Sequence, residues 1–392
     1  MDEVRMVRDR YPEPAPPTAQ EIARAKALLN EAPRRSLPRL RWGLGGVVAA
    51  GAAATLAFTL VGGNTSGGGN PAPLRTVNLD AKGAILAAAE KAEQQPIGKY
   101  WYVDHLDGQS YIMRPKTGTY AITGATSESF SWYGAKPGMG EAYYGRDLPA
   151  HPLTARDAAL WRKAGSPSSF RVWSGDKYLT FTTKATKWSA NGPERGTDPR
   201  GGGDFMGKSA KELQNLPTSP DELAKMFLSE TEMKRAMGHL PNPRAELEQR
   251  FRQAEPYSDI MRVASLLGRA PVPPKVRAGL MRALASQPGI HAIGRGTDPL
   301  DRQGVALASD DRATTVTGEF GGPKVDQGTY RSRAVVIFDE RTGALLSRQE
   351  ELTKPGGRYA EMKPGFIIEY QAVRSTNWTD TKPTPPAELP FD

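Results

Sequence analysis

The side chains that could do chemistry are few and widely spaced along this chain. It contains no cysteine, which excludes disulfides, thiolate metal sites and a cysteine nucleophile. The histidines show none of the HxH, HxxxH or HExxH spacings that place two ligands on one strand or helix, and they are His105, His151, His239 and His291. We therefore expect no metal site and no bound cofactor.

Patterns that pair a nucleophile with a base are missing as well. Asp104 and His105 are neighbours, but adjacent residues of a strand point to opposite faces of a sheet. No GxSxG motif marks a nucleophilic serine, and glycines 201–203 lack the GK[ST] of a phosphate loop. Glu350 and Glu351 fall in a strand expected at the surface. These absences predict that the chain is not an enzyme, with a hydrolase of unrecognised site as the alternative.

Aromatic residues gather between residues 98 and 133, in short strand-like runs separated by turn signals. Asp107-Gly108 and Thr117-Gly118 favour hairpin turns, so the region predicts an antiparallel meander. Its aromatic face either packs on helices of the same domain or faces a hydrophobic ligand. The candidate ligand-facing aromatics are Tyr100, Tyr102, Tyr111, Tyr120 and Trp132.

An uncharged run from Trp42 to Val61 indicates where in the cell these residues act. Its twenty residues match the length of a transmembrane helix, although many are glycine and alanine. Arginines precede the run and none follows it closely, which predicts a cytoplasmic amino terminus. A cleaved signal peptide and a buried soluble helix are the alternatives, but forty-one residues before the run are unusually many for a signal peptide.

Four segments follow from this interpretation: a cytoplasmic tail (1–41), a transmembrane helix (42–61), a Gly/Pro-rich tether (62–74) and an extracytoplasmic domain (75–392). The expected location is the cell membrane, with a single span and the carboxyl-terminal domain outside the cytoplasm. In the tail, Thr18 and Glu21 have the spacing of a capping box that starts a short helix. One face of that helix could bind a cytosolic protein through residues 1–33, and it consists of Ile22, Ala25, Leu28 and Leu29.

The exported part reads as an α+β domain, because strands come first, then helices, then strands again. A helix is expected over residues 78–95, a short helix from a cap at Thr154, and a hairpin over 170–184. A helical block spans residues 217–287, and the run from Tyr330 to Leu352 predicts a hairpin with its turn at residues 339–343. We expect a curved antiparallel sheet packed against the helical block.

Several segments carry a resemblance to known proteins: MDEVRMVRDRYPEPAPPT, LPTSPDELAKMF, APVPPKVRAGLMRALASQPGIHAIGRGTDPLDRQGVALA and IFDERTGALLSRQEEL. Together they resemble a set of actinobacterial single-pass membrane proteins of uncharacterised function, often found beside extracytoplasmic-function sigma factors. The exported part is more loosely similar to the half-barrels of lipoprotein carriers and of periplasmic sensors that bind anti-sigma factors, where a concave sheet faces a few helices. That likeness implies a groove for an acyl chain, and the family implies no catalytic residues.

Two functional hypotheses remain, and neither involves nucleic acid. The net charge of +9 is spread along the chain without a basic stripe, so a phosphate track is not indicated. The first hypothesis is a membrane-anchored extracytoplasmic sensor or interaction protein, linked to sigma-factor signalling through its tail. The alternative is a non-enzymatic protein of the cell envelope that binds a lipid or another hydrophobic ligand.

Overall fold

The computed structural model describes residues 79–384, with gaps at 176, 192–196, 199–202, 204, 229–244 and 320. The predicted tail, span and tether lie outside the described residues, as does the proposed partner face at Ile22, Ala25, Leu28 and Leu29. None of the described helices combines the length and the apolar character that a bilayer crossing requires.

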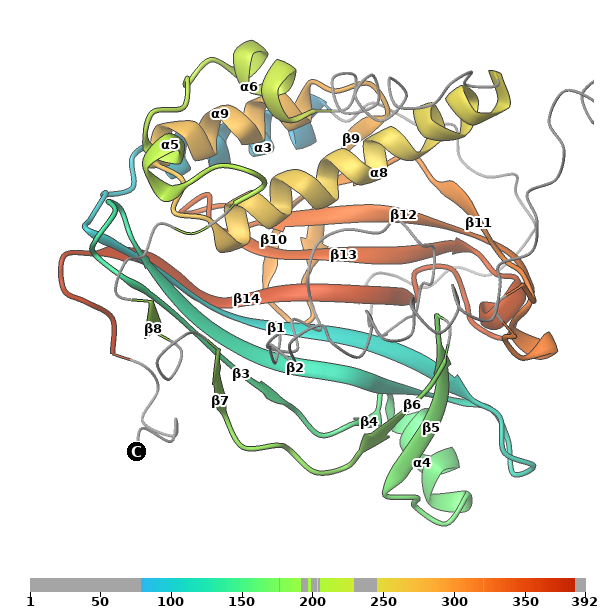
Figure 1. The fold of residues 1–392 in the computed structure, drawn as a ribbon. Coiled ribbons are helices and arrows are strands. Elements are labelled where there is room, and N and C mark those ends of the chain that lie inside the picture. The colour runs from blue at the N-terminus through green and yellow to red at the C-terminus, as the bar shows by residue number, and fades with distance from the viewer. Residues whose placement is uncertain are drawn as a thin grey trace, which may run out of the picture. The chain divides into compact units, whose positions relative to one another are not determined.

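One large antiparallel sheet dominates the described part (Figure 1). Its central strands follow the order β7-β3-β2-β1-β14-β13-β12-β10-β9, so the last strand lies between the first strand and its own predecessor. The strands are β1 (Tyr100–Met113), β2 (Tyr120–Gly134), β3 (Glu141–Asp147), β4 (His151–Pro152), β7 (Ser189–Asn191), β8 (Thr197–Asp198), β9 (Ile290–Thr297), β10 (Gln303–Ser309), β11 (Arg312–Val316), β12 (Gly328–Phe338), β13 (Leu345–Lys354) and β14 (Ile367–Thr379).

Most of the helices gather on one face of this sheet, with α8 crossing β12 and β13, whereas α4 lies apart from them beside β4 (Figure 1). The described helices are α3 (Leu79–Glu93), α4 (Ala155–Lys163), α5 (Ala210–Gln214), α6 (Pro220–Phe227), α8 (Ala245–Arg269) and α9 (Pro274–Ala285), with short 3-10 turns η1 (Lys324–Asp326) and η2 (Gly357–Tyr359). Local signals explain several boundaries. The Thr154 side chain accepts a hydrogen bond from the Asp157 amide at the start of α4, and Pro220 opens α6.

The main core lies between the helices and the sheet. Ile85 of α3, Ile260 and Val263 of α8 and Leu280 of α9 are fully buried there, against Val336 and Phe338 of β12 among other strand residues. Burial of this apolar area is the main contribution to the stability of the layer. The helix-bearing face of the sheet is therefore filled by the protein's own side chains at this end.

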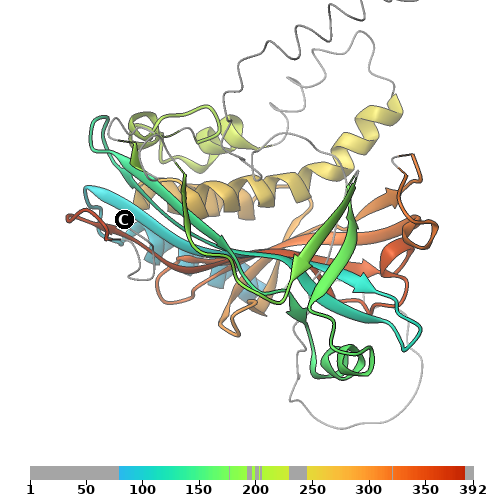
Figure 2. The same ribbon diagram turned by 60° about the horizontal axis from the view of Figure 1, so that its bottom comes forward.

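A second core lies at the far end of β1 and β2. A separate two-stranded hairpin, β5 (Ser169–Ser174) and β6 (Lys177–Thr182), stands beside these strand ends (Figure 2). Phe170 and Val172 of the hairpin are buried with Tyr120, Tyr330 and Tyr359, which come from three distant parts of the chain. This core fixes the hairpin against the sheet.

The structure confirms the α+β class, the large antiparallel sheet and the hairpin of β12 and β13. In the turn of that hairpin, Asp339 Oδ1 accepts hydrogen bonds from the amides of Arg341 and Thr342. The hairpin turn expected at Asp107-Gly108 is wrong, because β1 continues straight through both residues. The reason is the Tyr370 ring, which lies where a side chain at position 108 would stand, so only glycine fits in that strand.

Candidate functional site

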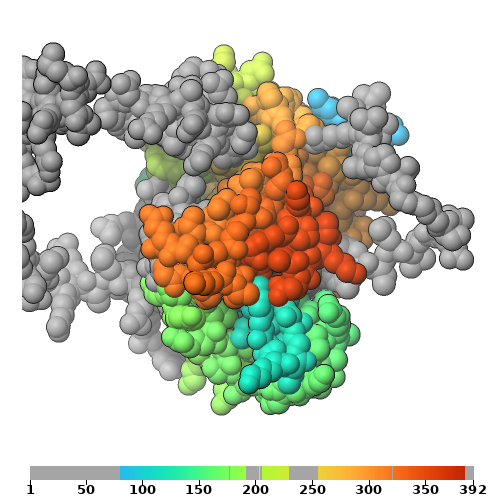
Figure 3. Space-filling view, turned by 90° about the vertical axis from the view of Figure 1, so that its right-hand side faces the viewer, coloured from blue at the N-terminus to red at the C-terminus, as the bar shows by residue number. Residues whose placement is uncertain are grey.

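A pocket opens where the far end of β1 meets the hairpin β5–β6 and the two 3-10 turns. It is a cavity of about 200 Å³. Figure 3 shows these segments side by side on one face, with η1 and η2 in orange to red above the ends of β1 and β2 in cyan and the hairpin region in green. The lining residues are Tyr111–Arg114, Arg171, Val172, Trp173, Tyr178, Pro323, Val325, Asp326, Arg358 and Tyr359.

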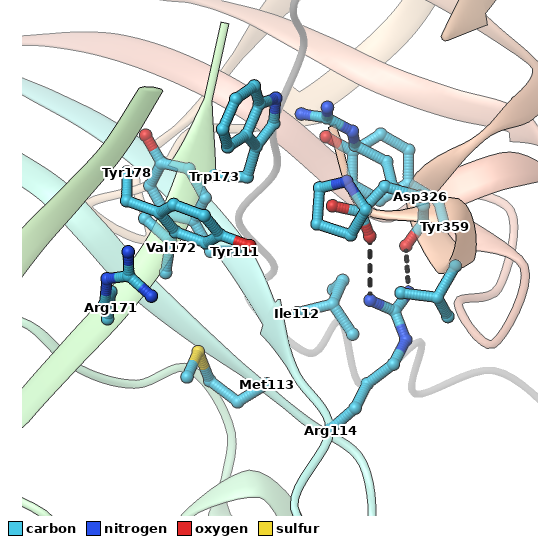
Figure 4. Close-up of a pocket in the computed structure, with 13 residues that line it drawn as sticks. Tyr111, Ile112, Met113, Arg114, Arg171, Val172, Trp173, Tyr178, Asp326 and Tyr359 are labelled. Carbon is cyan, nitrogen blue, oxygen red and sulfur yellow. Dashed lines mark hydrogen bonds and ion pairs between the residues drawn. The ribbon is translucent and has the colours of Figure 1, made fainter. Parts of the chain in front are cut away.

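Aromatic rings form one wall of the pocket (Figure 4). Trp173 and Tyr178 meet edge to face, with ring centroids 5.0 Å apart. Tyr111 lies behind them, and its hydroxyl is 3.2 Å from Ser174 Oγ, which ties the hairpin to β1. Burial raises the pKa of the Tyr111 hydroxyl. The backbone before η1 passes so close that a Cβ at Gly322 would stand 3.0 Å from Trp173 Nε1. This wall is thus held in place from two sides.

Arg114 holds the opposite wall together. Its guanidinium donates to Asp326 Oδ1 at 3.0 Å, to Glu361 Oε1 at 2.9 Å and to the carbonyl oxygen of Arg358 at 2.7 Å. One side chain directly after β1 therefore binds η1 and η2 (Figure 4) and also the segment after η2. With its charge engaged by two carboxylates, Arg114 acts as a structural part of the pocket.

Arg171 also contributes a positive charge, but its surroundings differ from those of Arg114. It is exposed, and its guanidinium carbon lies 3.7 Å from the centroid of the Tyr178 ring. No described carboxylate forms an ion pair with it, in contrast to Arg114. A guanidinium stacked on a ring keeps the N–H groups at its edge available for hydrogen bonds.

The mouth of the pocket exposes apolar surface. Tyr178 is 44% exposed and Val325 is 56% exposed, which places both among the large hydrophobic side chains most open to solvent in the described part. They line the pocket from β6 and from η1. A small polar and aromatic cavity with an apolar rim is an arrangement that binds ligands.

Of the five predicted ligand-facing aromatics, the structure places only Tyr111 in this pocket. Tyr120 is 2% exposed in the core beneath the hairpin. Tyr100, Tyr102 and Trp132 belong to a separate aromatic cluster with Phe130, Tyr144 and Trp188. The fold does not bring the five residues together. Alternate residues of one strand face opposite sides of the sheet, and the strands are long.

The pocket residues that sequence reasoning missed come from four distant segments. Trp173 and Tyr178 were within the predicted hairpin, and two aromatics on facing strands were a usable signal. Asp326, Arg358 and Tyr359 follow no local pattern that points to a site. Only the folded chain brings them beside β1.

Charged residues form a second feature, a polar layer between α8 and the middle of the sheet. Glu350 of β13 is 2% exposed, which contradicts the expected surface strand. It accepts hydrogen bonds from Tyr257 of α8 at 2.8 Å and from Ser332 at 2.5 Å. The partner strand places Ala334 beside it on this same covered face, which is why Glu350 is buried while its neighbour Glu351 pairs with Arg333 on the other face.

The layer continues along β1 as a histidine–aspartate pair. His105 Nε2 lies 3.1 Å from Asp107 Oδ2, two residues along the strand, whereas Asp104 lies 3.8 Å from Arg374. Burial raises the pKa of Asp107, but His105 and neighbouring arginines outweigh it and hold that pKa below its usual range. Ser129 stands opposite His105 in the sheet, yet its hydroxyl is 3.0 Å from the Tyr143 hydroxyl and His105 is only 3% exposed.

The described histidines lie in three separate places. His291 pairs with Asp310 at 3.0 Å, and His151 Nδ1 lies 3.0 Å from the Pro149 carbonyl oxygen. Within the described ranges, no group of three or more acidic or histidine side chains is arranged to hold a metal ion.

Fold and pocket together define an α+β protein built on one antiparallel sheet, with a small aromatic and basic cavity at one end. No protein-family model matches the sequence, and no curated protein is significantly similar to it. Among solved structures, the chain is loosely similar to LprF from Mycobacterium bovis, at 6% identity and a TM-score of 0.22, over 79% of this chain and 99% of that one. So low a score supports no conclusion about ligand or partner.

Proposed function

We propose that this chain is a membrane-anchored binding protein whose folded part lies outside the cytoplasm and recognises a ligand in the pocket beside Trp173, without catalysing a reaction. The pocket itself carries this proposal. It combines aromatic walls, a few fixed polar groups and an exposed apolar rim, which is how ligand sites are commonly built.

The size of the pocket favours a sensor or interaction protein over a carrier of whole lipids. Its volume of about 200 Å³ is below the roughly 300–1,000 Å³ of pockets that enclose a drug-sized ligand. One end group fits, and the rest of the ligand would lie across Tyr178 and Val325. The alternative of an acyl chain in the sheet groove has less support, because the main core fills the helix-bearing face.

Reporting through the tail is the second part of the proposal, and it rests on the amphipathic pattern of residues 1–33. In this reading the anchor connects a bound ligand outside to a cytosolic partner, within a sigma-factor pathway. Deletion of residues 1–33, with the arginines and the span retained, should abolish crosslinking to a cytosolic protein while the outer domain is still displayed. Unchanged crosslinking would exclude a role for the tail.

Protease digestion of intact cells tests the location. The folded part should be cleaved from outside while the tail stays protected, and full protection of both would exclude an extracytoplasmic domain. Binding is tested on the full-length chain in lipid nanodiscs with ring-bearing fragments, followed by ligand-observed NMR. Trp173→Ala should reduce binding, whereas Trp188→Ala, in the other aromatic cluster, should not.

A further inference from the structure

We infer that the pocket selects an anionic end group, a carboxylate or a phosphate, attached to a flat apolar group. This inference rests on the proposed binding function and specifies the chemistry of the ligand. The observation behind it is the juxtaposition of Arg171 with the exposed ring of Tyr178 at the pocket mouth.

Charge is the first reason. The pocket is lined by three guanidiniums, Arg114, Arg171 and Arg358, and by one carboxylate, Asp326. Asp326 and Glu361 both pair with Arg114, so the charge of Arg114 is already offset and does not itself favour an anion. Arg358 is 5% exposed, which puts one positive charge deep in the pocket wall where water screens it little.

The position of Arg171 is the second reason. Stacking on Tyr178 holds the guanidinium flat, so that its edge offers parallel N–H donors in the plane of the fork. Carboxylates and phosphates match this fork with two hydrogen bonds, whereas an amide offers a single acceptor oxygen. Arg171 is held by a ring, and binding an anion there breaks no ion pair with a carboxylate of the described residues.

The apolar surroundings are the third reason. Trp173 and Tyr178 present two ring surfaces on one side, and Pro323 and Val325 line the other. A flat group fits between such walls, and its burial would cover the exposed parts of Tyr178 and Val325. The ligand is thus anionic at one end and apolar beside it.

Three matched probes test the inference on the full-length chain in nanodiscs of uncharged lipid: 3-phenylpropionate, its neutral analogue 3-phenylpropanamide, and phenyl phosphate. We expect the anions to bind at least about tenfold more tightly than the amide at about pH 7 and low salt, since charge-assisted hydrogen bonds are roughly twice as strong as neutral ones. Added salt should reduce this preference. The relative affinity of the two anions identifies which kind of end group the pocket takes.

Variants locate the effect. Arg171→Gln should reduce the preference to about twofold or less, because it removes the paired charge-assisted hydrogen bonds that an anion accepts. Val325→Glu adds a negative charge at the rim and should weaken both anions. The matched control is Arg156→Gln, an exposed arginine of α4 outside the pocket. All three side chains are exposed, so the variants should fold, which thermal unfolding verifies.

Each outcome has a distinct meaning. If none of the probes binds, the proposed binding function of the pocket fails together with the inference. If the amide binds as tightly as the anions, the pocket binds ligands but does not select charge. An anion preference that survives in Arg171→Gln overturns the assignment of Arg171.

Discussion

The hydroxyl of Tyr257 in α8 donates a hydrogen bond of 2.8 Å to Glu350 Oε2 in β13, across ninety-three residues of sequence. Burial, followed by the charge of Glu350, raises the pKa of Tyr257 well above its ordinary value, so the phenol stays a donor. Arg312 stacks on the same ring at 3.5 Å and lies 3.7 Å from Glu350. One phenol thus connects the long helix to the buried charge of the sheet.

Loss of this hydroxyl should weaken the fold. We expect Tyr257→Phe to lower the free energy of unfolding by about 1–3 kcal/mol, because a buried carboxylate loses a donor. Urea denaturation measures the change. Tyr178→Phe is the control, since that side chain is 44% exposed, and it should stay within about 0.5 kcal/mol. Equal effects of the two variants would contradict the structural role of the Tyr257 bond.

Arg277 of α9 should be replaceable by an apolar residue. It is 6% exposed, donates to the Leu267 carbonyl oxygen at 2.8 Å and stacks 4.7 Å from the Trp101 ring, and no described carboxylate pairs with it. We expect Arg277→Met to leave stability unchanged or to raise it, because the desolvation cost of the charge disappears. Arg277→Lys should destabilise, since it keeps the charge and loses the flat stacking surface.

The pH dependence of the stability distinguishes the cost of burying the Arg277 charge from a simple packing effect. Burial lowers the pKa of Arg277 to about 10. A base whose pKa is lower in the folded state costs stability while it is protonated, so wild-type stability should gain as the pH rises through about 10. Arg277→Met should lack that gain, which urea titrations on either side of this pH would reveal.

Two glycines that both have a positive φ should respond differently to alanine. Gly343 has φ +68° and a Cβ there would stand 2.1 Å from the Ala88 carbonyl oxygen of α3, whereas Gly365 has φ +88° and open space around it. We expect Gly365→Ala to cost about 1–2 kcal/mol from the left-handed backbone alone. Gly343→Ala should cost clearly more, because the turn must also move away from α3. Thermal unfolding of both variants compares them directly, and similar losses would contradict the close approach.

Two carboxylates of the sheet, Asp107 of β1 and Glu369 of β14, should have opposite effects on acid stability. The pKa of Asp107 is held below its usual range, whereas burial raises the pKa of Glu369 despite the nearby Arg348. Asp107 therefore stabilises the fold above its unfolded pKa, and this contribution is lost as the pH falls. Ionised Glu369 costs stability, and this cost is relieved as the pH falls through its raised pKa.

The matched variants are Asp107→Asn and Glu369→Gln. At neutral pH we expect the first to lower the melting temperature and the second to leave it unchanged or raise it, with only a modest gain because Glu369 is 34% exposed. Glu369→Gln should converge on the wild type as the pH falls through the raised pKa of Glu369. The deficit of Asp107→Asn should begin to shrink only below about pH 4 and should persist in part at the acid end of the range, because folded Asp107 stays ionised there. Melting temperatures measured between about pH 3 and 8 check the prediction, and a fall of the same size in both variants would overturn it.

Local sequence patterns predicted the elements well and the site poorly. The alternation in residues 330–352 and the cap at Thr154 each depend on neighbours in sequence, and both elements are present. The turn predicted at Gly108 was wrong because glycine is needed there to make room for the Tyr370 ring, which is distant in sequence. In α3, Leu86 is 41% exposed although it is apolar, whereas Ile85 beside it is fully buried.

The pocket could not be predicted because no single segment contains it. Arg114 meets Asp326 and Glu361 only after β1 has been brought beside residues more than two hundred positions away. The aromatic cluster at Tyr100, Tyr102 and Trp132 was visible in the sequence, but which face of the sheet each ring occupies depends on strand register.

Because β14 lies in the middle of the sheet, the sheet cannot form without this last strand of the described part. Within the described part, the strands from β7 to β1 in the sheet order and those from β13 to β9 are connected by strand pairing only through β14. A chain that ends before residue 367 would hold two separate groups of strands, each with an open edge where its neighbour should be. Such fragments should aggregate or be degraded, so the sheet closes only on a polypeptide whose synthesis has passed residue 379.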